Sequence, residues 1–149
     1  MGGYTVAKKE IIEILRQRSR PYLFSNSLAP SIVGASIKAL ELIDSSTDLI
    51  DKVQANTAYF KKGMKELGFD FVDGESAIVP VMLYDAKLSQ KMADALLKEG
   101  IYVIGFFYPV VPKEKARIRV QLSAAHDKQH LDKAINAFKK VGLELGVIS

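Results

Sequence analysis

Two arginines are the residues of this sequence that are best placed to do chemistry. Arg117 and Arg119 stand in the run ARIRVQLSAAH over residues 116–126, where apolar and polar side chains alternate. A period of two predicts a half-buried β-strand with both guanidinium groups on its polar face. Such groups can bind a carboxylate or a phosphate through paired N–H donors. Because exposed arginines usually face only solvent, a solvated strand face is the alternative.

Length and composition narrow the class of protein. The chain has 149 residues, enough for a domain with a hydrophobic core, and 48% of them are apolar. No apolar run approaches the roughly 20 residues of a membrane span, and the first residues lack a signal-peptide layout. The absence of cysteine excludes disulfides, thiolate chemistry and cysteine-ligated zinc. We therefore expect a cytoplasmic protein that contacts no membrane.

Charge and histidine content argue against two further classes. The net charge of +4 comes from lysines scattered in pairs, not from a basic block, so we expect no nucleic-acid partner. His126 and His130 have the i,i+4 spacing of a metal pair on a helix, but no HExxH motif surrounds them. We interpret them as surface histidines in a first helical turn, and we predict no metal site.

The first third of the chain is predicted to be helical. A helix over 6–18, with Thr5 as its N-cap, precedes a non-helical loop over 19–30 that contains two prolines. A second helix over 31–43 is apolar nearly all round, which is typical of a buried helix. Because little sheet is available to cover it, this third indicates an intimate oligomer or a piece of a larger protein.

The rest of the chain alternates between strands and helices in the order β-α-β-β-α, after a helix that ends near Gly68. The expected ranges are strands over 69–72, 77–83, 101–104 and the arginine strand, and helices over 89–98 and 127–145. Pro80 indicates a sheet edge or a bulge. The predicted fold class is α+β, a small mostly antiparallel sheet with helices packed on one face. We place the domains at 1–45, a helical segment with an interface loop, and 46–149, the α+β domain.

Three segments carry a resemblance to a known family. They are GGYT at 2–5, LRQRSRPYLFSNSLAP at 15–30 and the arginine run at 116–126. In this order they resemble the C-terminal part of the α-oxoamine synthases, and among these the glycine C-acetyltransferases. The resemblance covers essentially the whole chain, and the RPYLFSNS string is long and specific. It implies the small C-terminal domain of a pyridoxal-phosphate enzyme with the aminotransferase fold, fold type I.

The resemblance also implies an activity. It implies a homodimeric acyltransferase that uses pyridoxal phosphate to condense glycine with acetyl-CoA, giving 2-amino-3-oxobutanoate and CoA in threonine degradation. In the family the Schiff-base lysine lies shortly before the Gly-Gly-Tyr-Thr string, so this chain lacks it. Lys8 and Lys9 match no cofactor motif. The lone chain is therefore expected to be inactive and to bind no pyridoxal phosphate.

The resemblance assigns roles to particular residues. Arg119 matches the family arginine that pairs with the α-carboxylate of the amino acid, and its planar fork suits that task. Ser25 matches a hydroxyl that reaches the cofactor phosphate of the other subunit, with Phe24 and Asn26 beside it. Without the resemblance, the Ser25 hydroxyl is more typical of turn stabilisation. Arg117 is expected to form only a surface ion pair.

Weaker candidates and rival functions remain open at this point. Phe106, Phe107 and Tyr108 can line a substrate mouth or fill the core, and His126 is expected only to help open the last helix. The order β-α-β-β-α also resembles the ferredoxin-like layout of free-standing amino-acid-binding regulatory modules. The missing basic stripe disfavours a nucleic-acid module.

Overall fold

A computed structural model describes residues 3–149 of the chain. The chain forms two compact units, Met1–Thr47 and Asp48–Ser149, and each is described by itself. None of the helices within residues 3–149 is both long and apolar enough to cross a bilayer.

The first unit consists of three helices, α1 (Lys9–Arg18), α2 (Arg20–Leu23) and α3 (Pro30–Ser45). The prediction of Thr5 as an N-cap is wrong, because α1 starts later, after Lys8, and no side chain caps it. The prediction of a wholly non-helical loop over 19–30 is also wrong. Pro21 supplies the fixed φ that suits a first helical turn, and the short helix α2 forms around it.

Within residues 3–47 of the first unit, no side chain is buried. Large apolar side chains on all three helices are exposed instead: Ile11, Ile14, Leu15, Tyr22, Leu23, Val33, Ile37, Leu40, Leu42 and Ile43. Helices of this length gain most of their stability from packing of an apolar face. This unit has no core of its own, so its apolar surface needs a cover that the described residues do not provide.

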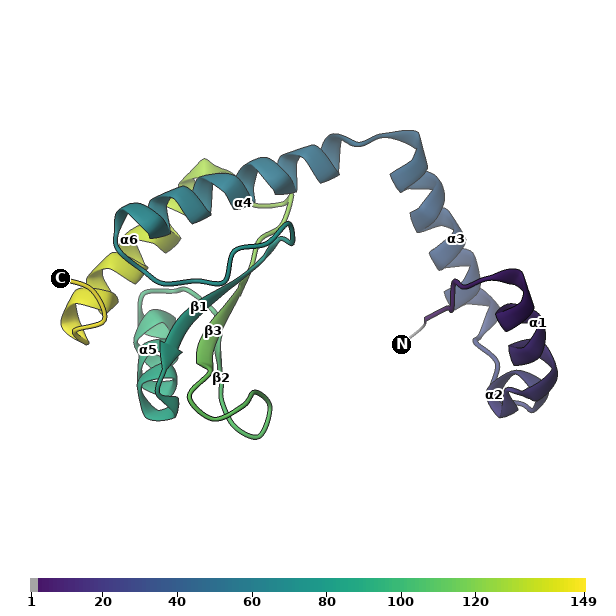
Figure 1. Cartoon of the computed structure of the whole chain (residues 1–149). Helices are drawn as coiled ribbons and strands as arrows, with labels where there is room; N and C mark the ends of the chain where they lie inside the picture. Colours follow the sequence, from purple (N-terminus) through teal and green to yellow (C-terminus); the bar gives the residue numbers. More distant parts are fainter. Residues whose placement is uncertain (1–2) are drawn as a thin grey trace. The chain divides into compact units, whose positions relative to one another are not determined.

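The second unit is an α+β layer structure, as predicted (Figure 1). Its elements are α4 (Asp48–Glu66), β1 (Ile78–Tyr84), α5 (Ala86–Lys98), β2 (Ile104–Phe106), β3 (Ala116–Gln121) and α6 (Lys128–Glu144). The three strands form an antiparallel sheet in the order β1-β3-β2, which places the arginine strand in the centre. The predicted order β-α-β-β-α is confirmed.

Two predicted strands are wrong in detail. The strand expected over 69–72 is reduced to one bridge between Phe71 and Val81, beside β1. The strand expected over 101–104 begins only at Ile104, because the Ile101 N–H donates to the Leu96 carbonyl and closes α5 instead of joining the sheet. Pro80 lies in β1, an outer strand of the three-stranded sheet, as predicted.

The core lies between the sheet and the three helices α4, α5 and α6. Each of the three helices contributes fully buried side chains. β3 buries every second residue, whereas β1 buries Val79 and the run 81–83. The largest fully buried side chains are Phe60, Met64, Met92, Leu96, Phe138, Val79, Val81 and Ile118. The Phe138 ring packs edge-on against Phe60 at 6.0 Å and against Phe69 at 5.8 Å between centroids. This packing fixes β3 from one side and leaves its other face open.

Candidate functional site

The open face of β3 carries the arginines. Ala116, Ile118 and Val120 point into the core and are at most 8% exposed, while Arg117 is half-buried and Arg119 is exposed. This alternation confirms the half-buried strand predicted from the sequence. The core therefore sets which way both guanidinium groups face, because a slip of one residue would bury them.

Arg119 is oriented by an aromatic ring on the neighbouring strand. Its guanidinium carbon lies 5.4 Å from the centroid of the Phe106 ring. Arg119 pairs directly with Ile104, so Phe106 is its diagonal neighbour across the sheet, within reach of a long side chain. The distance of 5.4 Å is that of a cation–π contact, which leaves N–H donors of the guanidinium group available for a planar anion. Within residues 3–149 no carboxylate lies within ion-pair distance of Arg119.

Arg117 behaves differently. Its Nε donates a hydrogen bond of 3.1 Å to the carbonyl of Lys115, two residues earlier. The predicted surface ion pair is wrong: in the described part of the chain no acid pairs with Arg117. The reason is local geometry, since the backbone carbonyl at the start of the strand is nearer than any carboxylate.

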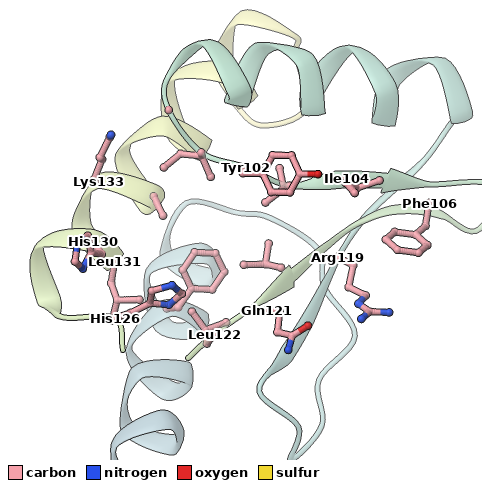
Figure 2. A pocket seen from close by; sticks show the side chains of 16 residues that line it. Tyr102, Ile104, Phe106, Arg119, Gln121, Leu122, His126, His130, Leu131 and Lys133 are labelled. Atoms are coloured by element: carbon pink, nitrogen blue, oxygen red, sulfur yellow. The ribbon is translucent and has the colours of Figure 1, made fainter. Parts of the chain in front are cut away.

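A cavity of about 530 Å³ extends from Arg119 along β3 to the start of α6 (Figure 2). Its walls are the segment 100–104, the end of β3 and the first turns of α6, and its floor includes Phe60, Val120 and Leu122. The polar or ionisable side chains that line it are Arg119, Gln121, His126, His130, Lys133 and the exposed Tyr102. No aspartate or glutamate is among the lining residues.

Both histidines lie at the entry to α6. Nδ1 of His126 accepts the Ser123 N–H at 3.2 Å, and Nδ1 of His130 accepts the Asp127 N–H at 3.2 Å. Asp127 caps α6 in return by accepting the His130 N–H at 3.1 Å, and this bond is the main cause that lowers the pKa of Asp127. The interpretation as a first-turn residue is confirmed for His130 and wrong for His126, which precedes the N-cap Asp127 and lies outside the helix.

The turn between β3 and α6 is held by Asn56, which sequence patterns did not single out. Nδ2 of Asn56, on α4, donates to the carbonyls of Ser123 and His126, each at 2.9 Å. Asn56 is 67 and 70 residues away from these partners, and no motif marks it. Its two bonds fix the end of the arginine strand and the position of His126.

The remaining predicted residues are separated. Ser25, with Phe24 and Asn26 beside it, is exposed in the bend after α2 and belongs to the first unit, whereas Arg119 belongs to the second. Phe106 lines the cavity. Phe107 and Tyr108 are outside its lining, and the Tyr108 ring lies 5.5 Å from the Lys113 ammonium.

The fold and site together define a class. The α+β layers of the second unit have the fold of the C-terminal part of fold type I pyridoxal-phosphate enzymes. The chain belongs to the family of class I and II aminotransferases, whose model matches residues 1–138. The resemblance to the α-oxoamine synthases is confirmed by individual relatives.

Curated relatives include the 2-amino-3-ketobutyrate coenzyme A ligase of Escherichia coli, 57% identical over 148 residues, which are 99% of this chain and 37% of that protein. The human mitochondrial protein of the same name is 50% identical, over 95% of this chain and 34% of its own length. The 8-amino-7-oxononanoate synthase of Thermosipho melanesiensis is 48% identical, over 99% of this chain and 38% of that protein. The chain thus spans little more than a third of these relatives.

Solved structures give the same picture. The serine palmitoyltransferase of Sphingomonas wittichii superposes with a TM-score of 0.86 at 27% identity, over 97% of this chain and 37% of that one. A variant of the S. paucimobilis enzyme, solved with a bound PLP–myriocin aldimine, superposes with a TM-score of 0.88 at 29% identity, over 96% of this chain and 36% of that one. Both matches support the predicted fold class.

Proposed function

We propose that this chain is the C-terminal domain of a pyridoxal-phosphate-dependent acyltransferase that condenses glycine with acetyl-CoA to 2-amino-3-oxobutanoate and CoA. The observation that carries this proposal is Arg119, a guanidinium group in cation–π contact with Phe106 and free of any carboxylate partner within residues 3–149. Relatives that are 57% and 52% identical to the chain carry the name 2-amino-3-ketobutyrate coenzyme A ligase. The free-standing regulatory module is not favoured, because the similarity extends over the whole chain.

In this proposal Arg119 binds the glycine carboxylate. A carboxylate that meets the free N–H edge of the guanidinium accepts two parallel hydrogen bonds, which fixes both its position and its orientation. Fixing the carboxylate orients the α-carbon of glycine, whose proton must be removed before the new carbon–carbon bond forms. Arg117 is given no part in this step; its Nε donates to the Lys115 carbonyl, and the guanidinium of Arg119 is the one that lines the cavity.

The residues present fit part of pyridoxal phosphate. When bound, this cofactor supplies an electron sink for the α-carbon of the amino acid. The exposed Ser25 hydroxyl, followed by the Asn26 amide, suits a phosphate oxygen. We assign Ser25 to the cofactor phosphate of the opposite subunit in a homodimer, with Phe24 and Asn26 adjacent. No lysine here matches the Schiff-base segment, so the lone chain is proposed to be inactive and to hold no cofactor.

The first unit fits an interface role. Its three helices expose apolar side chains throughout, as a segment that contacts other parts of a dimeric enzyme would. We therefore keep the homodimer and the interface loop as parts of the proposal. A cytoplasmic location is kept also: the mouse and human relatives are named mitochondrial, and the bacterial relatives are not.

A chimera tests the proposal directly. The matching 148 residues of the E. coli relative are replaced by those of this chain, and CoA release from acetyl-CoA is measured against glycine concentration. We expect activity that depends on glycine. Arg119→Gln should lower kcat/KM for glycine by about 10- to 150-fold, the equivalent of a charged hydrogen bond, while KM for acetyl-CoA changes little.

Two matched controls accompany this experiment. Arg117→Gln removes a charge from the same strand face and should stay within about threefold of the parent chimera. Ser25→Ala should weaken retention of pyridoxal phosphate during dialysis, followed by absorbance, whereas Ser27→Ala should not. A soluble dimeric chimera without glycine-dependent CoA release would refute the activity. An unchanged kcat/KM for glycine in Arg119→Gln would refute the role of Arg119.

A further inference from the structure

The cavity beside Arg119 extends well beyond the space that one small carboxylate fills. Its volume is about 530 Å³, whereas a water molecule takes about 30 Å³ of liquid. Arg119 and Phe106 lie at one end, and His130 and Lys133 lie at the other, with Gln121 and Leu122 between them (Figure 2). The proposed binding of glycine uses only the first end.

The far end carries two imidazole rings and an ammonium group. Nδ1 of His126 accepts the Ser123 N–H at 3.2 Å, so Nε2 is the ring nitrogen left for a ligand. Nδ1 of His130 lies 3.2 Å from the Asp127 backbone nitrogen and 3.0 Å from an Asp127 carboxylate oxygen, which likewise leaves Nε2 for a ligand. The two ring centroids are 6.2 Å apart. Lys133 adds an ammonium group, which lies beside Gly100.

Carboxylates are absent from the cavity lining, although the chain has 17 acidic residues. The nearest acid on the histidine side, Asp127, faces Nδ1 of His130 and is engaged as the cap of α6. Within residues 3–149 neither Lys133 nor Arg119 has an acidic partner in an ion pair. Both ends of the cavity therefore favour an anionic group.

The part between the two ends is apolar. The side chains of Val120, Leu122 and Leu131 are at most 8% exposed and form the floor with Phe60, and the segment 101–104 forms the opposite wall. A ligand that joins two anionic groups by a hydrocarbon chain matches this sequence of surfaces: cation, apolar floor, cation.

We propose that this cleft binds an organic dianion of the dicarboxylate class, with one carboxylate on Arg119 and the other among His126, His130 and Lys133. The proposal rests on the carboxylate-binding role of Arg119 in the proposed function, and extends it to a second anionic group. Glycine would occupy only the Arg119 end of the cleft. A longer dicarboxylate would use Arg119 and the far end together.

The test uses the full 149-residue chain labelled with ¹⁵N. Succinate, glutarate and adipate are titrated against butyrate, valerate and hexanoate at fixed ionic strength, and amide shifts at the two ends are followed. We expect one dicarboxylate to bind about tenfold more tightly than its matched monocarboxylate, because it gains a second charged contact. Only the dicarboxylate should shift the amides of His130 and Lys133.

Variants separate this inference from the proposed function. Lys133→Gln should reduce the preference for the dicarboxylate severalfold, and Lys139→Gln, on the same helix but outside the cleft, should leave it unchanged. If Lys133→Gln keeps the full preference, or if no dicarboxylate exceeds its monocarboxylate, the cleft inference is wrong while Arg119 can still bind glycine. If Arg119→Gln leaves binding of both classes unchanged, the proposed role of Arg119 is wrong too.

Discussion

Removing the Asn56 side chain should loosen the end of the arginine strand. Asn56→Ala deletes two hydrogen bonds of 2.9 Å, to the carbonyls of Ser123 and His126. Each such bond contributes about 1 kcal/mol net, so the loss is about 2 kcal/mol before compensation. Alanine is the better helix former by about 0.5 kcal/mol, which offsets part of the loss on α4. We expect the free energy of opening to fall by about 1–2 kcal/mol.

Hydrogen exchange of the buried β3 amides at Ile118 and Val120 measures this change within the second unit alone, where a whole-chain melt would mix in the first unit. The expected change corresponds to roughly 5- to 30-fold faster exchange. Asn136→Ala is the matched control, because Asn136 is an exposed asparagine on α6 and its replacement tests helix propensity only. If Asn56→Ala exchanges no faster than Asn136→Ala, the two bonds do not hold the turn.

Three further outcomes are expected. Gly142→Ala should destabilise the second unit in a urea titration, because its Cβ would lie 2.6 Å from the Phe69 ring; an unchanged midpoint would show that the ring moves freely. The pKa of Asp127 is lowered in the folded chain, so its contribution to stability is present above its ordinary value of 3.8 and is lost as pH falls through the lowered pKa; Asp127→Asn should flatten this acid dependence, measured by far-UV circular dichroism. Residues 48–149 alone should keep the amide spectrum of the second unit, since every core residue lies in that range, and a collapsed spectrum would contradict this.

Periodicity predicted the arginine strand well, and physical reasons explain why it succeeded there. In β3 each inward residue is buried against helices, so burial and sequence alternate in step. The apolar run over 101–104 carried no such information, because strand pairing begins only after the Ile101 N–H has closed α5. Sequence patterns miss the short helix α2, because the prolines over 19–30 indicate a loop. Pro21 instead fits the first turn of a helix.

The residues that contact Arg119 and the β3–α6 turn could not be predicted from the sequence. Phe106 lies beyond the strand expected over 101–104, but it belongs to β2 and makes a cation–π contact with Arg119 from the diagonal position. Asn56 is 67 and 70 residues away from its two partners in the sequence. Such contacts follow from register and helix placement, which single-sequence patterns do not encode.

Exposure of Arg119 sets how much of the proposed chemistry the lone chain can do. An ion pair between exposed groups contributes about 0–1 kcal/mol, because water competes for both partners. The same pair gains strength when a surrounding structure excludes water, since the effective dielectric constant falls. The chain spans 37% of its E. coli relative, and its first unit exposes apolar helices that need a cover. If that cover also encloses β3, the contact of Arg119 with Phe106 has already restricted the guanidinium, so closing the site adds binding strength at a smaller cost of ordering this side chain.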